Sequence, residues 1–130
     1  MKDEVVELGS LDISLYSCIS RDIDTPRVVV TNNQLVHMLQ KHPEAYEETL
    51  IELKNTINDP DYIFRDDKHA DTGLVIKELS LNDHFIYIVL RVCTNSENGK
   101  YANSILSGWK ISKSRLENYI RNKTILYKRP

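Results

Sequence analysis

The sequence predicts an α+β fold in which N-terminal helices pack against one face of an antiparallel β-sheet. Two observations support this prediction. Apolar residues recur at helical spacing between residues 35 and 57, and alternating or apolar β-rich segments follow one another after residue 61. Because three of the later connections are short enough for hairpins, the sheet is expected to be antiparallel. At 130 residues the chain is expected to form one domain, residues 1–130.

The first part of the chain is predicted to contain two strands and two helices. ISLYSCI (13–19) and RVVV (27–30) are β-rich runs separated by the polar, turn-like RDIDTP. Thr31 has N-cap chemistry and predicts the start of a helix with apolar residues along one side. Pro43 interrupts that helix and suits the first turn of the next one, PEAYEETLIELKNTIN (43–58).

From residue 62 the sequence predicts five strands and one short helix. The strands are YIF (62–64), TGLVIKEL (72–79), HFIYIVLRVCT (84–94), NSILSGWKI (103–111) and TILYK (124–128), and the helix is KSRLENYIRN (113–122). Alternate aliphatic residues of the longest strand share the face expected to meet the helices: Ile86, Ile88, Leu90 and Val92. The opposite face carries a mixed set: Phe85, Tyr87, Val89, Arg91 and Cys93. Such a face suits base stacking with phosphate contact, or simply a half-exposed strand.

Composition narrows the class of protein. No run of about 18 apolar residues occurs and the N-terminus is acidic, so a soluble, cytoplasmic protein without a membrane partner is expected. Cys18 and Cys93 lie far apart in apolar contexts and predict structural thiols. The net charge of −2 conceals an asymmetry, because residues 100–130 contain eight basic residues and one acidic residue. This basic third suits nucleic acid, or pairing with the acidic part of the same fold.

His37 and His42, in the stretch LVHMLQKHPEAY, are the first candidates for chemistry. Five residues apart, they are separated by about 140° on an ideal helix, which makes them a poor metal-binding pair. His42 is expected to point toward the body of the protein. In the plainer interpretation, His42 hydrogen-bonds a backbone carbonyl between the two helices and His37 is a surface residue.

The acidic stretch DPDYIFRDDKHAD is a second candidate, because Asp66, Asp67 and His69 carry metal-ligating groups. Its order does not match an EF-hand loop, and a solvated turn is the simpler interpretation. The chain also lacks GxSxG, GxxxxGK[ST] and GxGxxG motifs. Neither a metal nor a cofactor is therefore expected. The remaining imidazole, arginine, lysine and hydroxyl groups are sufficient for RNA cleavage by internal attack of a 2′-hydroxyl.

Four motifs occur in a distinctive order: the HxxxxHP corner, NDPDYI, the asparagine-led strand NSILSGW and a terminal LYK. In this order, from about Val28 to Arg129, the chain resembles the phage-associated barnase, EndoU, colicin and RelE-like (BECR) nucleases. The resemblance implies a metal-independent endoribonuclease or RNase-like toxin domain of phage or prophage origin, with its site on the sheet. It also implies RNA, tRNA included, as partner, and an inhibitor or host protein as a second partner.

Carried over by position, the resemblance implies four catalytic residues: His37, His42, Arg91 and Ser107. The two histidines would act as acid and base, Arg91 would stabilise the transition state, and Ser107 would orient the phosphate. Substrate-binding roles follow for Lys77, Tyr87, Trp109, Lys110, Lys113 and Arg115. Family members often have threonine where Ser107 stands, and a serine keeps the hydroxyl. The bulky Trp109 is expected to alter substrate choice or to fill the groove.

Two alternatives stay open. A catalytically inactive, phage-encoded protein-binding module on the same fold would not bring His42, Arg91 and Ser107 around one groove. A metal-dependent nuclease using Asp66, Asp67 and His69 would lose activity on chelation.

Overall fold

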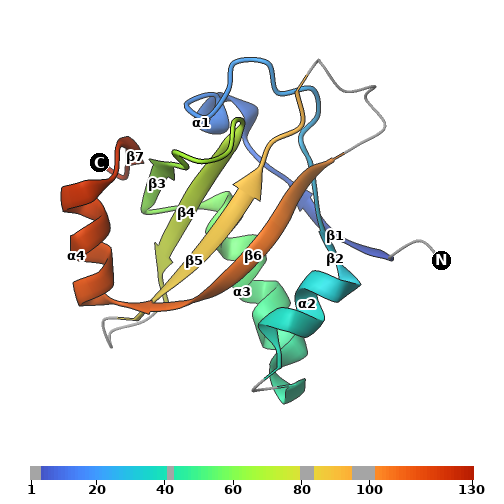
Figure 1. Cartoon of the computed structure of the whole chain (residues 1–130). Helices are drawn as coiled ribbons and strands as arrows, with labels where there is room; N and C mark the ends of the chain where they lie inside the picture. The colour runs from blue at the N-terminus through green and yellow to red at the C-terminus, as the bar shows by residue number, and fades with distance from the viewer. Residues whose placement is uncertain (1–3, 41–42, 80–83, 95–101) are drawn as a thin grey trace.

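The computed structural model describes residues 4–40, 43–79, 84–94 and 102–130. In chain order the elements are β1 (Val5–Ser10), α1 (Ile13–Tyr16), β2 (Arg27–Thr31), α2 (Asn32–Met38), the 3₁₀ turn η1 (Pro43–Ala45), α3 (Tyr46–Asn58), β3 (Tyr62–Arg65), β4 (Thr72–Glu78), β5 (His84–Arg91), β6 (Asn103–Ser112), α4 (Lys113–Asn122) and β7 (Ile125–Lys128). All the strands form a single sheet, with α3 behind it in the view of Figure 1. The predicted α+β class is confirmed.

The sheet is mixed, with the strand order β1-β2-β6-β5-β4-β3-β7. The predicted antiparallel succession from β3 to β6 is confirmed. The prediction of a wholly antiparallel sheet is wrong, because β2 and β6 pair in parallel. The segment between β2 and β6 contains α2, α3 and the strands β3 to β5. A connection of that length allows β2 and β6 to run in the same direction. The placement of the helices in the N-terminal part is not confirmed, because α4 lies between β6 and β7, where the sequence itself predicted a short helix.

Residues 13–19 do not form the predicted strand. Residues 13–16 form α1, whose N-cap is Asp12; the Asp12 carboxylate accepts a hydrogen bond from the Leu15 N–H at 3.3 Å. The Tyr16 ring is fully buried, and its hydroxyl donates to the Ile57 carbonyl at 2.7 Å. The apolar residues of this segment therefore pack against the end of α3. β1 lies in VVELGS, which the acidic composition of the N-terminus does not reveal as a strand.

The two helices predicted after Thr31 are confirmed. α2 begins with a capping box, in which the Thr31 hydroxyl accepts from the Gln34 N–H and the Gln34 side chain accepts from the Thr31 N–H. The segment 43–58 forms η1 and then α3. The later strands and α4 agree with the prediction to within three residues at their ends.

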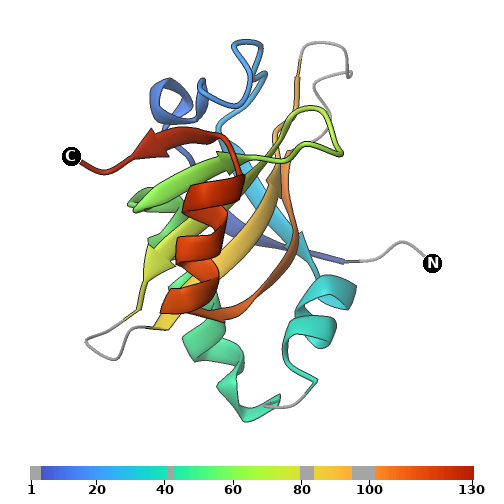
Figure 2. The ribbon, with the colours of Figure 1, turned by 60° about the vertical axis from the view of Figure 1, so that its left-hand side comes forward.

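Two hydrophobic clusters cover the two faces of the sheet. The first cluster joins α1, α2 and α3 to the predicted inward set of β5: Ile86, Ile88, Leu90 and Val92. The second cluster lies under α4, where Leu116 packs with Phe85 and Tyr87. Figure 2 shows α4 in front of the sheet. The mixed face of β5 is therefore half covered. Phe85 and Tyr87 are buried under α4, whereas Arg91 is exposed.

Gly73 of β4 occupies a place with no room for a side chain. A Cβ there would lie 2.5 Å from Ile19 Cδ1, 2.9 Å from Ile19 Cγ1 and 3.3 Å from Ile63 Cγ2. We expect Gly73→Ala to lower the free energy of unfolding by about 1–3 kcal/mol, as overpacking does. Urea denaturation measures this loss. In an Ile19→Val background the cost should be smaller, because Cδ1 is absent; an equal cost in both backgrounds would contradict the explanation.

Candidate functional site

One face of the central strands stays partly uncovered beside α4, and we call it the open face. Its side chains come from three strands: Thr72 and Leu74 of β4, Tyr87, Val89 and Arg91 of β5, and Ser104, Ser107 and Trp109 of β6. In the β5–β6 register, Arg91 is opposite Ser104, Val89 is opposite Ser107 and Tyr87 is opposite Trp109. Residues directly opposite each other in an antiparallel pair point to the same side of the sheet. Arg91, Ser107 and Trp109 therefore share one face.

A β-bulge in β6 adds Ser104 to the same face. Val89 pairs with Ser107 and Leu90 pairs with Ile105, so Leu106 is the extra residue. In a regular strand, Ser104 and Ser107 would point to opposite faces because they are three residues apart. The bulge places both serine side chains on the open face.

Trp109 is the accessible aromatic residue of the open face. Its side chain is 41% exposed, and its ring stacks on Tyr87 with a centroid distance of 4.5 Å. Tyr87 itself is 6% exposed, and its ring centroid is 5.4 Å from that of Tyr119 on α4. Tyr87 thus supports Trp109 from below, and Trp109 presents the ring on which a base could stack.

Burial raises the pKa of the Tyr87 phenol well above its usual value. Tyr119 and Asp66 raise it further, and the positive charge of Arg115 opposes them. The phenol therefore stays protonated at neutral pH. These influences also place Asp66, from the β3–β4 loop, and Arg115, from α4, near the Tyr87 hydroxyl.

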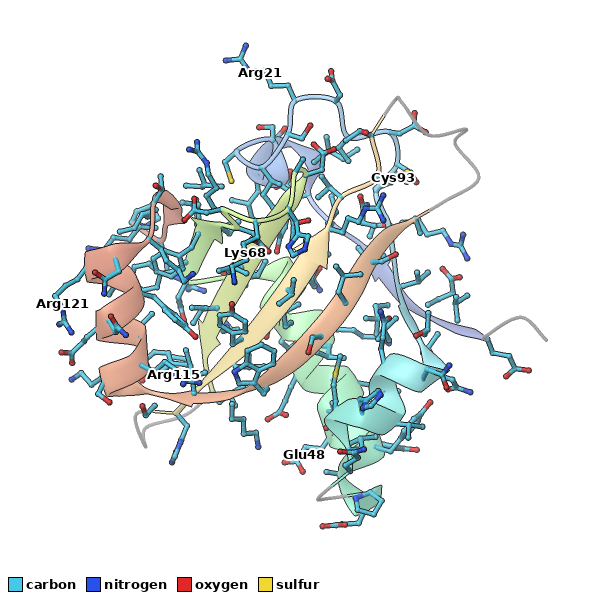
Figure 3. All side chains as sticks on the ribbon, in the orientation of Figure 1. Arg21, Glu48, Lys68, Cys93, Arg115 and Arg121 are labelled. Atoms are coloured by element: carbon cyan, nitrogen blue, oxygen red, sulfur yellow. The ribbon has the colours of Figure 1, made fainter. Side chains whose placement is uncertain are left out.

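The basic C-terminal third borders the open face through α4. Figure 3 shows Arg115 near the strands, whereas Arg121 points away from the sheet. Lys113 lines a separate cavity of about 360 Å³ with Phe85 and Glu117. Of the predicted substrate-binding residues on α4, Arg115 thus lies beside the open face, and Lys113 lies along a different cavity.

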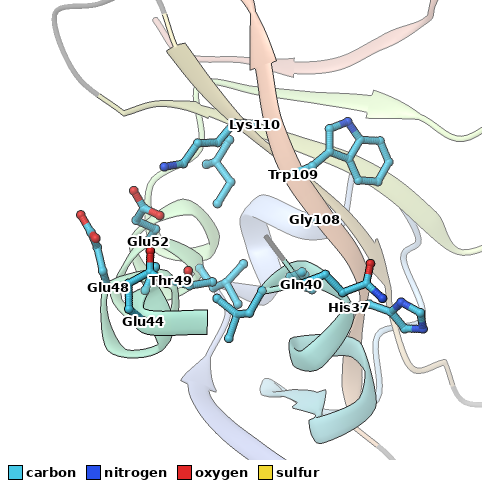
Figure 4. A pocket seen from close by; sticks show the side chains of 14 residues that line it. His37, Gln40, Glu44, Glu48, Thr49, Glu52, Gly108, Trp109 and Lys110 are labelled. Atoms are coloured by element: carbon cyan, nitrogen blue, oxygen red, sulfur yellow. The ribbon is translucent and has the colours of Figure 1, made fainter. Parts of the chain in front are cut away.

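His37 and Lys110 lie along a cavity of about 680 Å³ between α2, α3 and β6, which Trp109 also borders (Figure 4). The α3 wall is acidic, with Glu48 and Glu52. Burial raises the pKa of Glu52, and the charge of Lys110 opposes that rise. Lys110 therefore faces carboxylates across this cavity, and it points away from the open face, since it is paired with Ile86.

Lys77 does not contribute to the open face. Lys77 is paired with Ile86 and therefore faces the α3 side, where its ammonium donates to the Asp59 carbonyl at 2.8 Å. His42 lies outside the described residues. The structure thus brings together Arg91, Ser107, Tyr87 and Trp109, and places His37 at the neighbouring cavity.

Asp59 forms ion pairs with both Lys77 and Arg129, near the C-terminus. Arg129 contacts Asp59 Oδ1 at 2.6 Å and Asp61 Oδ1 at 2.8 Å. The hydrogen bonds from Arg129 and Lys77 hold the pKa of Asp59 below its usual value, against the effect of desolvation. This carboxylate therefore stabilises the fold at neutral pH, and the contribution is lost as the pH falls below about 4, through the lowered pKa.

We expect Arg129→Gln to reduce the difference in unfolding free energy between pH 7 and pH 3. Urea denaturation of wild type and variant at both pH values measures this. Arg21→Gln is the control, because Arg21 projects away from the protein in Figure 3. An unchanged pH dependence in Arg129→Gln would contradict the role of this ion pair.

The acidic stretch contains a turn at residues 66–71 in which residues 67–70 are exposed, as the sequence predicted. His69 Nδ1 lies 3.3 Å from Asp66 Oδ2. Among the residues that the structure describes, no three His, Cys, Asp or Glu side chains gather as metal ligands. Within the same residues, no helix is long and apolar enough to span a membrane. Cys18 and Cys93 are free thiols.

A sequence model of one protein family matches residues 6–128. The family is described as phage-Barnase-EndoU-ColicinE5/D-RelE like nuclease2. No curated protein and no solved structure matches the chain. The matched range includes the whole open face and α4.

Proposed function

The chain belongs to the phage-Barnase-EndoU-ColicinE5/D-RelE like nuclease2 family, and on this premise we propose that it is a metal-independent endoribonuclease. In the proposed reaction, a ribose 2′-hydroxyl attacks the adjacent phosphorus. The products are a 2′,3′-cyclic phosphate and a 5′-hydroxyl. RNA, tRNA included, is the proposed substrate.

The proposal rests above all on the placement of Arg91, Ser107 and Trp109 on the open face. A guanidinium stabilises the charge that develops on the phosphorane, and a hydroxyl orients a phosphate oxygen by donating a hydrogen bond. An exposed indole stacks on a base. These groups can hold one nucleotide by its phosphate and its base at once.

Imidazoles supply the acid and the base in this proposal, because they exchange protons near neutral pH. His37 and His42 are the candidates from the sequence. His37 lines the cavity that Trp109 also borders.

The test is to incubate the purified protein with a labelled RNA oligonucleotide in EDTA, beside the same sequence made of DNA. We expect RNA fragments with cyclic-phosphate and 5′-hydroxyl ends, and intact DNA, because DNA lacks the attacking hydroxyl. Cleavage that requires an added divalent cation would contradict metal independence. Intact RNA with a folded protein would contradict the proposal and favour an inactive binding module.

A further inference from the structure

The loop of residues 66–71, between β3 and β4, is held against the ends of two strands of the open face. The Asp66 N–H donates to the Thr72 carbonyl at 3.3 Å, and the Val92 N–H donates to the Asp71 carbonyl at 2.8 Å. Asp71 adopts a left-handed conformation with φ 57°, which turns the chain back toward β4. In Figure 3, Lys68 is drawn in front of β4 and β5.

This loop lies next to the residues that the proposed function uses. Thr72, directly after the loop, is paired with Arg91 across β4 and β5. Asp66, at the start of the loop, acts electrostatically on Tyr87, on which Trp109 stacks. Both ends of the loop therefore lie beside Thr72, which is paired with Arg91, and the Asp66 carboxylate acts on the Tyr87 phenol.

Within the loop, Asp66 and His69 form a polar pair of unequal exposure. The side chain of Asp66 is 15% exposed and that of His69 is 69% exposed. Asp66 Oδ1 accepts a hydrogen bond from the Lys68 N–H at 2.8 Å, and Asp66 Oδ2 lies 3.3 Å from His69 Nδ1. Both carboxylate oxygens thus have a partner, and the outer part of the imidazole is open to solvent.

The carboxylate also stays charged. Burial alone would raise the pKa of Asp66, but the hydrogen bonds with Lys68 and His69 and the charge of His69 outweigh burial and lower it. An ionised carboxylate only accepts hydrogen bonds, so it favours the tautomer of His69 with the proton on Nδ1. Nε2 is then the basic nitrogen, and it lies on the side of the ring away from Asp66.

We propose that His69 is the general base of the RNA-cleaving reaction, with Asp66 as its positioning residue. This inference rests on the proposed function. In the step, the 2′-oxygen forms a bond to phosphorus, and its proton moves to His69 Nε2. The bond from phosphorus to the 5′-oxygen breaks, and that oxygen leaves with the electron pair and takes a proton from a second imidazole, which acts as the acid. Arg91, beside the loop, faces the phosphate charge.

The experiment compares kcat and KM of the wild type, His69→Ala and His84→Ala on an RNA oligonucleotide in EDTA. We expect kcat of His69→Ala to fall about 10²- to 10⁴-fold, the usual range for a lost general base, with KM nearly unchanged. Added imidazole should restore part of the activity. His84 is the matched control, because it is an exposed histidine on β5 whose pairing with Ser112 directs it to the other side of the sheet.

Asp66 is tested by a conservative and a neutral variant. Asp66→Asn should lose activity to a level between wild type and His69→Ala, because the amide no longer favours one tautomer. Asp66→Glu keeps the carboxylate and should retain more activity than Asp66→Asn. Equal activity of these two variants would contradict the positioning role.

The outcomes separate the inference from the function on which it rests. An active wild type with an equally active His69→Ala would overturn the inference and leave the proposed function standing. A loss that imidazole does not restore, with a raised KM, would also overturn it, since that pattern indicates substrate binding. Intact RNA with folded wild type would overturn the proposed function and the inference with it.

Discussion

Replacing Asn103 by alanine is expected to lower the free energy of unfolding by about 3–5 kcal/mol, because one buried and two partly buried backbone groups lose their partner. Asn103 is fully buried at the start of β6. Its Oδ1 accepts from the Cys93 N–H at 2.8 Å, and its Nδ2 donates to the Thr25 carbonyl at 2.7 Å and the Arg27 carbonyl at 2.9 Å. One side chain thus joins the chain after β5 to the start of β2 and to the residues just before it. The loss is a large part of a typical stability of about 5–15 kcal/mol.

Urea denaturation of Asn103→Ala and of the neighbouring Ser104→Ala measures this effect. Ser104 is half-buried, and its hydroxyl donates a long hydrogen bond, 3.4 Å, to the Ala102 carbonyl. Its replacement should cost no more than about 0.5 kcal/mol, as most surface changes do. A loss below about 1 kcal/mol in Asn103→Ala would show that water takes over the three hydrogen bonds.

Arg91→Ala is expected to reduce kcat/KM for RNA cleavage by about 10²- to 10³-fold, the range observed when a group that stabilises transition-state charge is removed. Arg91 is exposed on the open face, two residues along β5 from Val89, which is paired with Ser107. Arg91→Lys should recover part of the loss, because an ammonium keeps the charge without the two-pronged geometry.

Arg65→Ala provides the matched control for this measurement. Arg65 is also exposed at the end of a strand, but it is paired with Gly73 and lies on the opposite face of the sheet. It should therefore leave kcat/KM within about twofold of wild type. Equal losses in Arg91→Ala and Arg65→Ala would indicate nonspecific attraction of RNA to positive charge, and would contradict a site on the open face.

Much of the local structure could be predicted because the signals are local. The capping box at Thr31, the proline at 43 and the alternation along 84–92 each depend on neighbouring residues, and the helices and strand they predict are confirmed. The family resemblance is confirmed too, because it depends on the order of motifs along the chain. The segment 13–19 was mistaken for a strand because its apolar residues pack against α3, a contact that no local pattern reveals.

The candidate site was predictable only in part. Residue type marked Arg91, Ser107 and Trp109 as able to bind RNA, but only the β5–β6 register brings them to one face. Lys77 carries the same charge as Arg91, yet its position in β4 turns it toward Asp59 on the other side. The pair of Asp66 and His69 could not be distinguished from a solvated turn by composition, because its place depends on hydrogen bonds to β4 and to the chain after β5.

The sequence by itself determined the fold class, the family and most of the helices and strands. Helical periodicity, strand alternation and cap chemistry act between residues close in the chain. The parallel pairing of β2 with β6, the burial of Tyr87 under Trp109 and the composition of the open face were decided by the tertiary structure. They depend on which distant strands become neighbours, and that choice follows from burying the apolar faces of all the elements together.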